Sequence, residues 1–301
     1  MIVFLILAHR DFDHLLRLID SLDGQRIVLH MDKSSSDLWN KSEIFRAKKN
    51  LILINRNDSF NVRWAGYSQI LAMLLMMKTA IELMESGERM MFLSGSDYPI
   101  KSKAEIESKF ASQPSLEFLR YYKLDDRPKD IDRWASFHRW DFRLFKKRGT
   151  FLNRLNSLFI RFLTFFETMI RGRKEAPSFP LYAGSQWFAI SKECAQELIR
   201  LRNHHFDNFF KTMFAPDEVY FHTLFSLSSY SNSNIDKGVF KTIQNGSRLH
   251  QVRNLTYVDE SLNKWLDKDD LGTLLESEFL FARKFDSKIS EQLIYAILSR
   301  F

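Results

Sequence analysis

Blocks of apolar and polar residues alternate along the first part of the chain. IVFLIL predicts a strand, RDFDHLLRLIDSL has the apolar spacing of a helix, and QRIVLHMD predicts a second strand that ends at Asp32. NLILINR predicts a third strand, a helix follows from about Ser68 to Glu85, and RMMFLSGSD predicts a fourth strand. Alternating strands and helices indicate an α/β fold with a mostly parallel sheet flanked by helices.

The second half of the chain has a different pattern. Residues from about 129 to 174 are polar and aromatic with helical spacing, and they predict a helical insertion. FPLYAGSQWFAIS then has a strand pattern around a turn of small residues, and APDEVYFHTLF predicts a helix with proline at its first position. No linker or repeat divides the chain, so we expect one domain over residues 1–301, with halves 1–125 and 126–301.

Polar or aromatic side chains follow the predicted strands of the first half. They are His9, Asp32, Trp64 and Asp97. Because ligands of parallel α/β sheets bind beyond the carboxyl ends of the strands, these residues are candidates for a binding site. The alternatives are a core imidazole for His9, packing for Trp64, and a turn-forming role for Asp97 before Tyr-Pro.

Composition and charge narrow the possible partners. A net charge of +7 suggests an anionic partner, such as nucleic acid, a nucleotide-like substrate or acidic lipid. The charges are dispersed and the chain has no zinc-finger or RNA-recognition motif, so we expect no nucleic acid. The single cysteine, Cys194, fits a reducing compartment. No run reaches the roughly 18 apolar residues of a membrane span, which predicts a soluble or peripheral protein.

Six motifs carry a family resemblance. In order along the chain they are HMDKSS, WAGYS, LSGSDYPIKS, AGSQWFAIS, APDEVYFHTL and LFARKFD. Over about residues 1–290 the chain resembles the core-2/I-branching family of β-glycosyltransferases, which has peptide and plant xylosyltransferase relatives. The resemblance implies a GT-A type nucleotide-sugar fold, a UDP-sugar donor and an inverting mechanism. Residues 1–125 would then be the donor-nucleotide half, and 126–301 the acceptor and catalytic half.

The resemblance also implies that the usual Asp-x-Asp metal site is missing. A single carboxylate after SGS is a poor cage for a divalent cation, and we interpret the acids of DFD (11–13) and DID (130–132) as solvated. We therefore expect no metal and no cofactor. In such relatives an arginine and a lysine near the C-terminus neutralise the leaving UDP, and Arg253 and Lys284 match them. Arg283 is expected to point elsewhere. Without the resemblance these would be ordinary surface cations.

Further roles follow from the same match. Glu218 in PDE is the expected catalytic base, with Asp217 as the fallback, although proline followed by two acids also simply begins many helices. His9, Asp32, Trp64 and Asp97 are assigned to the donor site. Glu117, Lys129 and Arg133 resemble acceptor-binding positions. Trp187 offers a face for a sugar ring, with core packing as the alternative.

These expectations define a function. The chain would transfer a sugar, with GlcNAc favoured over xylose or glucose, from UDP to a hydroxyl of a glycan or glycolipid. A non-catalytic nucleotide-binding or nucleic-acid-binding protein is the alternative. Because the chain begins at its first strand, we expect a cytoplasmic bacterial relative that makes surface polysaccharide or lipopolysaccharide. Residues 151–174 are apolar with several basic residues, which predicts peripheral contact with an anionic inner membrane, or else a buried hairpin or dimer contact.

Overall fold

A computed structural model describes residues 1–125, 128–142, 150–241 and 248–300 of the chain. Its strands are β1 (Ile2–Ala8), β2 (Arg26–Met31), β3 (Leu51–Leu53), β4 (Arg89–Ser94), β5 (Asp97–Pro99), β6 (Tyr121–Lys123), β7 (Tyr182–Gly184), β8 (Ala189–Ser191), β9 (Thr256–Val258) and β10 (Phe281–Arg283). Its α-helices are α1 (Phe12–Ser21), α2 (Ser36–Trp39), α3 (Ser42–Arg46), α4 (Ser68–Leu83), α5 (Lys103–Ala111), α6 (Pro128–Ala135), α7 (Thr150–Arg171), α8 (Lys192–Leu201), α9 (His204–Phe210), α10 (Tyr220–Leu227), α11 (Arg248–Gln251), α12 (Leu271–Glu276) and α13 (Glu291–Leu298). Two short 3₁₀ helices are η1 (Pro216–Glu218) and η2 (Lys268–Asp270).

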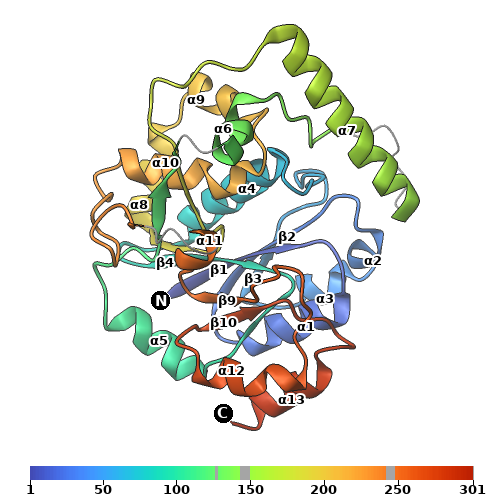
Figure 1. Cartoon of the computed structure of the whole chain (residues 1–301). Coiled ribbons are helices and arrows are strands. Elements are labelled where there is room, and N and C mark those ends of the chain that lie inside the picture. The colour runs from blue at the N-terminus through green and yellow to red at the C-terminus, as the bar shows by residue number, and fades with distance from the viewer. Residues whose placement is uncertain (126–127, 143–149, 242–247, 301) are drawn as a thin grey trace.

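The central sheet has the strand order β3-β2-β1-β4-β8 (Figure 1). The first four strands in this order are parallel, and β8 pairs antiparallel with β4 at the edge. The predicted α/β fold with a mostly parallel sheet is confirmed. Because β8 comes from the second half of the sequence, its pairing with β4 joins both halves in one sheet.

The alternation of side chains along β1 explains how helices cover both faces of this sheet. Val3 and Leu5 pack into one apolar cluster with residues of α4, α8 and α10. Phe4 and Ile6 point to the other face and pack with residues of α1 and α5. Successive side chains of a strand face opposite sides of the sheet, so a strand that is apolar throughout needs cover on both. Each large side chain buried in this way contributes about 1.5–3 kcal/mol.

Helix α1 begins at a cap that the sequence analysis misread. Asp11 has a left-handed backbone with φ of 57°, and its carboxylate accepts a hydrogen bond from the His14 N–H at 3.1 Å. Its second oxygen accepts from the Ser287 N–H at 2.8 Å. Asp11 is therefore a capping residue that also holds the C-terminal region against α1, and its interpretation as a solvated acid was wrong.

A second sheet lies beyond the end of β4 and brings the C-terminal region to it. Its strand order is β5-β10-β9, with β10 antiparallel to β5 and parallel to β9. In this register Arg283 is opposite Asp97 and also opposite Val258. Side chains on one face of this second sheet pack on α12 and α13. Residues that are far apart in the sequence thus meet at the end of the central sheet.

The helix predicted at APDEVYFHTLF is divided in the structure. Pro216–Glu218 forms the 3₁₀ turn η1, and α10 starts only at Tyr220, because Val219 leaves the helical conformation with φ of −121°. Glu218 therefore lies just before the N-terminus of α10 and not inside its first turn.

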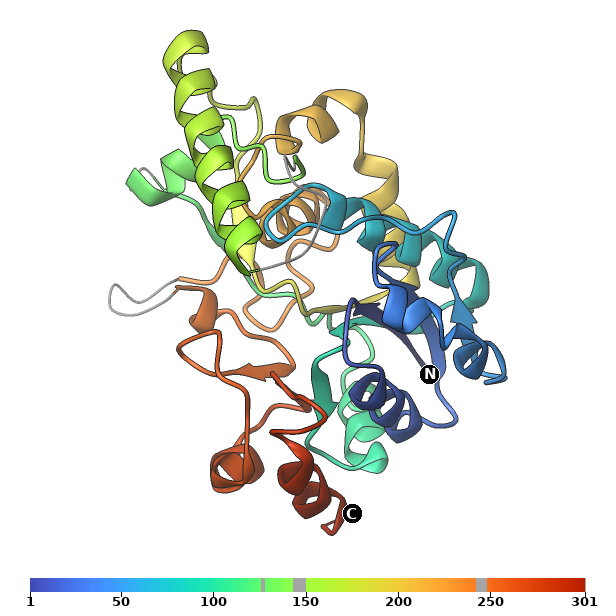
Figure 2. The ribbon, with the colours of Figure 1, turned by 90° about the vertical axis from the view of Figure 1, so that its right-hand side faces the viewer.

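The predicted insertion, about 129–174, contains α6 and α7 in its described part. Both views show α7 at the outside of the molecule, at the end opposite α12 and α13 (Figures 1 and 2). No helix among the described residues combines the length and apolar character that crossing a bilayer requires.

Candidate active site

Asp97 sits where β4 turns into β5, and its carboxylate points into the protein. Gly95 makes this turn possible, since a Cβ there would lie 2.9 Å from the Cβ of Ala8 on the neighbouring strand β1. Asp97 Oδ2 accepts a hydrogen bond from the Ser94 N–H at 2.8 Å. The side chain is fully buried, and burial raises the pKa of Asp97 to about 6, against the opposing effect of the Arg283 charge. This carboxylate shapes the turn, as its turn-forming interpretation predicted.

Arg283 is the charged neighbour of Asp97, so the expectation that it points elsewhere was wrong. Its Nε lies 3.5 Å from Asp97 Oδ1, which makes an ion pair but is too long for a strong hydrogen bond. The guanidinium stacks on the ring of Trp187, with its Cζ 4.3 Å from the ring centroid. Burial lowers the pKa of Arg283, and the negative charges of Asp97 and Asp217 oppose this effect. Arg283 therefore connects the end of β4 with the η1 turn.

Lys284 belongs to a group of cations beside this arginine. Its Nζ lies 3.5 Å from the Asn263 Oδ1. Burial lowers the pKa of Lys284, and repulsion from Arg283 and Arg10 lowers it further. Arg10 follows β1 and stacks on Trp265 with its Cζ 4.3 Å from the ring centroid. Lys284, Arg283 and Arg10 thus lie near one another, and Asp97 is the acid whose charge acts on Lys284. Such a group of cations is suited to binding an anion.

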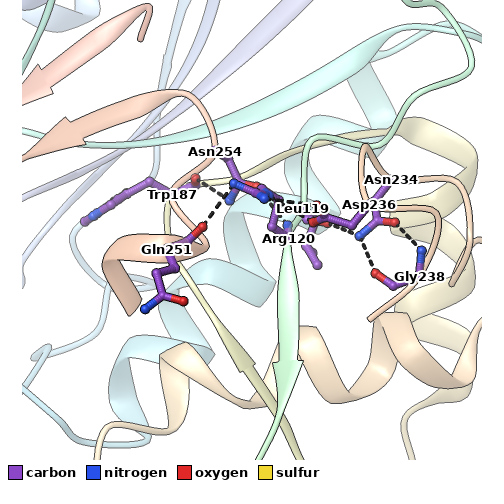
Figure 3. Close-up of polar contacts among 8 residues, drawn as sticks. All are labelled: Leu119, Arg120, Trp187, Asn234, Asp236, Gly238, Gln251 and Asn254. Carbon is purple, nitrogen blue, oxygen red and sulfur yellow. Dashed lines mark hydrogen bonds and ion pairs between the residues drawn. The ribbon is translucent and has the colours of Figure 1, made fainter. Parts of the chain in front are cut away.

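Arg253 lies in the segment before β9, and a polar network holds that segment (Figure 3). Its guanidinium donates hydrogen bonds to the carbonyl oxygens of His250 at 3.0 Å and Val258 at 2.7 Å. The neighbouring Gln251 carbonyl accepts from Arg120, and the Asn254 carboxamide bridges the Arg120 N–H and the Trp187 carbonyl. Because its donors bond to the backbone, Arg253 stabilises this segment in the structure.

Arg120 is the centre of the network in Figure 3. Its guanidinium makes two hydrogen bonds of 2.9 Å to the two carboxylate oxygens of Asp236 and a third of 3.0 Å to the Gln251 carbonyl. The Asn234 carboxamide bonds to the carbonyls of Leu119 and Gly238 and fixes the adjacent loop. The two-pronged arginine–carboxylate geometry is a strong and directional contact. Asp236 thus fixes the Arg120 side chain, whose separate bond to the Gln251 carbonyl attaches that segment to the residue before β6.

Glu218 is held by an arginine from the insertion. Arg133 donates a hydrogen bond of 2.7 Å to Glu218 Oε2. The same guanidinium bonds to the carbonyl oxygens of Phe214 at 3.0 Å and Ala215 at 2.6 Å. The Glu218 side chain remains 28% exposed, so one side of the carboxylate is open to a reactant. Arg133 was predicted to bind the acceptor, and the structure instead uses it to orient the expected base.

Asp217, the fallback base, is buried beside Glu218. Its carboxylate accepts a hydrogen bond from the Gln69 side chain, whose Nε2 lies 3.4 Å from Oδ2. Burial raises the pKa of Asp217 to about 7, and the negative charge of Glu218 adds to the increase. A carboxylate that is buried in this way has little surface with which to meet a substrate. Glu218 is therefore the better candidate for the base.

A family model described as the Core-2/I-Branching enzyme matches residues 2–265 of the chain. The chain belongs to this family. The resemblance drawn from the six motifs is thereby confirmed, and so is the glycosyltransferase class, at the level of the family. No curated protein matched the sequence.

Solved structures give only weak likenesses. The chain is similar to S. aureus TarS at 17% identity and a TM-score of 0.28, covering 49% of this chain and 26% of that one. A TarS fragment, 1–349, in complex with UDP is 16% identical with a TM-score of 0.28, covering 49% of this chain and 43% of the fragment. The chain thus spans about a quarter of the length of the full TarS chain. At these TM-scores the likeness carries no argument about function.

The other predicted donor-site residues of this branching-enzyme family member are Asp32, His9 and Trp64. The Asp32 carboxylate is used within the loop after β2, where it accepts from the Ser34 and Val62 N–H groups at 2.8 and 2.9 Å. His9 is exposed at the end of β1, next to Arg10. Trp64 is 72% exposed and packs edge-on against Trp140 and Phe214, on the Glu218 side of the site. Trp64 therefore lies closer to the expected base than a donor role predicts.

The acceptor-site predictions also change. Glu117 is buried, and its carboxylate accepts from the Ser191 N–H and hydroxyl at 2.8 and 2.5 Å and pairs with Arg89 at 3.4 Å. Trp187 is only 8% exposed, and Arg283 lies over one ring face, so the core-packing alternative describes it better. Lys129 is exposed on α6, one turn before Arg133. Glu117 and Trp187 thus have structural roles that sequence spacing could not reveal.

The possible metal ligands among the described residues can be compared with what a divalent cation requires. No group of three or more His, Cys, Asp or Glu side chains in the described part of the chain could hold an ion. The strand end that would carry the metal ligands has only Asp97, which is fully buried and faces Arg283. These residues do not fit a metal–diphosphate site, and the expectation of metal independence stays a prediction.

Proposed function

We propose that this chain is an inverting, metal-independent glycosyltransferase that moves a sugar from UDP to a hydroxyl of a glycan acceptor. The observation that carries the proposal is the proximity of two chemically different groups. Arg10, Arg283 and Lys284 form a cationic group, and Arg283 is also electrostatically linked to Asp217, the neighbour of Glu218. A leaving diphosphate and an accepting carboxylate are what a displacement at an anomeric carbon requires.

The reaction follows from these positions. The acceptor oxygen attacks the anomeric carbon while Glu218 takes the hydroxyl proton. The bond between that carbon and the UDP oxygen breaks, and its electron pair leaves with UDP. Lys284 and Arg10 stabilise the charge that develops on the leaving diphosphate, a contribution on the order of 3 kcal/mol for each well-placed donor. Attack from the face opposite UDP converts an α-linked donor into a β-linked product.

Arg133 and Arg283 act through their neighbours in this scheme. Arg133 fixes one oxygen of Glu218 and leaves the exposed side of the carboxylate for the acceptor. Arg283 balances the buried Asp97 and Asp217 and packs on Trp187, which keeps the site rigid. Arg253 is proposed to support the diphosphate side by holding the segment that leads into β9.

The finer features of the function are proposals as well. GlcNAc is the favoured donor sugar, with xylose and glucose as alternatives that share the same diphosphate chemistry. A cytoplasmic site of action in bacterial surface polysaccharide or lipopolysaccharide synthesis is part of the proposal. Peripheral contact with the inner membrane is supported by the exposed apolar side chains of α7.

The test combines donor binding with product analysis. UDP binding is measured by calorimetry in EDTA, and transfer from a set of UDP-sugars is followed in EDTA and with added Mn²⁺. We expect binding and turnover in EDTA, with the anomeric signal of a β linkage in the product. Activity that requires Mn²⁺, or an α-linked product, contradicts the proposal. UDP binding without transfer to any acceptor would indicate a non-catalytic nucleotide-binding protein.

A further inference from the structure

A groove of about 780 Å³ runs between α7 and the segment that follows α6. Most of its wall area is apolar, from Ile160, Phe165 and Met169 on the α7 side and Trp140 and Phe214 on the other. Polar atoms are added by Ser136, His138, Thr164 and Thr168. A volume of this size is in the range of pockets that bury most of a small organic ligand. Sugar rings need many polar partners, whereas these walls suit a hydrocarbon chain.

One wall of the groove belongs to the proposed acceptor side of the active site. Phe214 lines the groove, and its carbonyl accepts the hydrogen bond from Arg133, which in turn holds Glu218. The ring of Phe214 also contacts the exposed Trp64. A ligand in the groove would therefore lie next to the turn that carries the expected base.

The outer surface of α7 offers a route into the groove from a bilayer. Large apolar side chains outside the groove are exposed along this helix, namely Phe151, Leu158, Phe162, Phe166 and Ile170. Both views place the helix at the periphery of the molecule (Figures 1 and 2). Apolar side chains on an outer helix suit the interface of a membrane, where a lipid chain becomes available. The exposed side chains of α7 would by themselves explain membrane contact. The groove beside the helix therefore needs a separate explanation.

The charged side chains of the groove indicate which kind of lipid it would bind. Arg161 and Arg173 line it, and Asp132 is the acidic side chain that the described lining contains. Asp132 Oδ1 already accepts a hydrogen bond from the Ser136 hydroxyl at 2.7 Å. The balance is positive, which favours a ligand with an anionic group next to its apolar chain.

We propose that this groove binds the hydrocarbon chain of a lipid-linked acceptor whose phosphate lies against Arg161 and Arg173. The inference rests on the proposed function, because the sugar hydroxyl of that acceptor must still reach Glu218. It names the class of acceptor: a glycan carried on a lipid phosphate and not a free oligosaccharide or a protein.

The first test needs no donor. Dodecyl phosphate is titrated into the protein below its micelle concentration, with inorganic phosphate and dodecyl maltoside as comparison probes. Thr164 lines the groove, so Thr164→Trp fills it, whereas Leu158→Trp adds the same ring on an exposed part of α7 that does not line it. We expect saturable binding of dodecyl phosphate that Thr164→Trp weakens by at least about tenfold and Leu158→Trp leaves unchanged.

A second pair of variants on α7 tests the role of charge. Arg161→Gln should weaken dodecyl phosphate binding several-fold while leaving dodecyl maltoside unaffected, and Arg154→Gln, outside the groove lining, should change neither. Equal affinity in the wild type and Thr164→Trp overturns the proposal. So does inorganic phosphate binding as tightly as dodecyl phosphate, or binding to vesicles alone with no binding of the single-chain probe.

A second test uses turnover and separates this inference from the proposed function. Sugar transfer is compared for one acceptor sugar as its methyl and its dodecyl glycoside. We expect a higher kcat/KM for the dodecyl glycoside in the wild type and no difference in Thr164→Trp, with UDP affinity the same in both proteins. Equal kcat/KM for both glycosides in the wild type overturns the groove assignment. Loss of UDP binding and of all transfer overturns the proposed function, and the donor-free titration then still decides on the groove.

Discussion

Glu218 combines a fixed orientation with partial exposure, which are the two properties that a catalytic base needs. Arg133 holds one carboxylate oxygen at 2.7 Å, and the side chain is 28% exposed. Its neighbour Asp217 is buried and has a pKa raised to about 7. Two adjacent acids thus have different environments, and each can be tested by replacing the carboxylate with the amide of the same shape.

We expect Glu218→Gln to lower kcat by roughly 10²- to 10⁴-fold, because the amide cannot take the acceptor proton. UDP affinity should hardly change, since the cations and not Glu218 meet the diphosphate. Steady-state kinetics with calorimetry of UDP binding provides the measurement. Asp217→Asn serves as the comparison and should have a milder effect on kcat. Near-normal transfer by the Glu218→Gln enzyme would remove Glu218 from its role.

The cationic group makes its own prediction. Lys284→Ala and Arg10→Ala should each weaken UDP binding by about tenfold or more, because a charge-assisted contact to phosphate is lost. Lys288→Ala is a suitable control, since this lysine is exposed in the same part of the chain. The binding constants can be measured by calorimetry at fixed salt concentration. If both variants bind UDP as the wild type does, the diphosphate lies elsewhere.

Asp217 also makes the stability of the protein depend on pH. Between the ordinary pKa of 3.8 and the folded value of about 7, the folded protein keeps a proton that the unfolded chain has lost. The free energy of unfolding is therefore highest below pH 4 for this group and falls as pH rises toward 7. A difference of this size corresponds to at most about 4 kcal/mol.

Asp217→Asn removes this titrating group and should flatten the decline of stability between pH 4 and pH 7. Urea unfolding at several pH values measures the slope for both proteins. Asp97 has a pKa raised to about 6, so its contribution to stability also falls as pH rises. Some slope should therefore remain in the variant. An identical slope in the two proteins would show that Asp217 does not hold its proton in the folded state.

At the scale of elements, the active site depends on how the segment before β9 is attached to β6. Arg120 holds Asp236 and the Gln251 carbonyl at once, and its guanidinium also lies over Phe240, with its Cζ 4.5 Å from the ring centroid. The site therefore depends on an arginine that has no contact with the expected reactants. Arg120 is a positioning residue.

Replacing Arg120 with methionine should keep much of the aliphatic packing and remove all three guanidinium hydrogen bonds. We expect the free energy of unfolding to fall by about 1–3 kcal/mol. Hydrogen exchange in residues 248–258 should accelerate, and UDP affinity should fall with it. Lys123→Met changes an exposed cation in β6, three residues after Arg120, and should do neither. Unaltered exchange in residues 248–258 would contradict the positioning role.

The whole molecule has an uneven surface, with the α/β body at one end and the exposed apolar side chains of α7 at the other (Figure 1). The chain carries a net charge of +7, so attraction to an anionic surface adds to any insertion of α7. Each basic residue near such a surface contributes about 1 kcal/mol. Binding of this kind is reversible and sensitive to salt.

We expect the protein to float with vesicles that contain anionic lipid and to dissociate as the salt concentration rises. The double variant Leu158→Ser, Phe162→Ser should bind more weakly, since both side chains are exposed on α7. Ile52→Ser, at an exposed apolar position of β3, is the matched control and should bind as the wild type does. Flotation that is absent, or equal in all three proteins, would contradict membrane contact through α7.

Local patterns in the sequence determined the elements and the family. The alternation of IVFLIL and RDFDHLLRLIDSL predicted β1 and α1, because the periods of a strand and a helix depend only on neighbouring residues. The six motifs, in order, predicted the branching-enzyme family, which the family model confirms. The single carboxylate after SGS already argued against a metal pair at that strand end.

Only the tertiary structure decided which charged side chains meet. Arg133 and Glu218 are 85 residues apart, and Arg120 and Asp236 are 116 apart, so no local period relates them. Arg283 entered the site because β10 pairs with β5 in a register that places it opposite Asp97. Glu117 cannot bind an acceptor, because hydrogen bonds from Ser191 at the end of β8 enclose its carboxylate. Pairing of distant segments sets these contacts, since an ion pair depends on distance in space and not on separation along the chain.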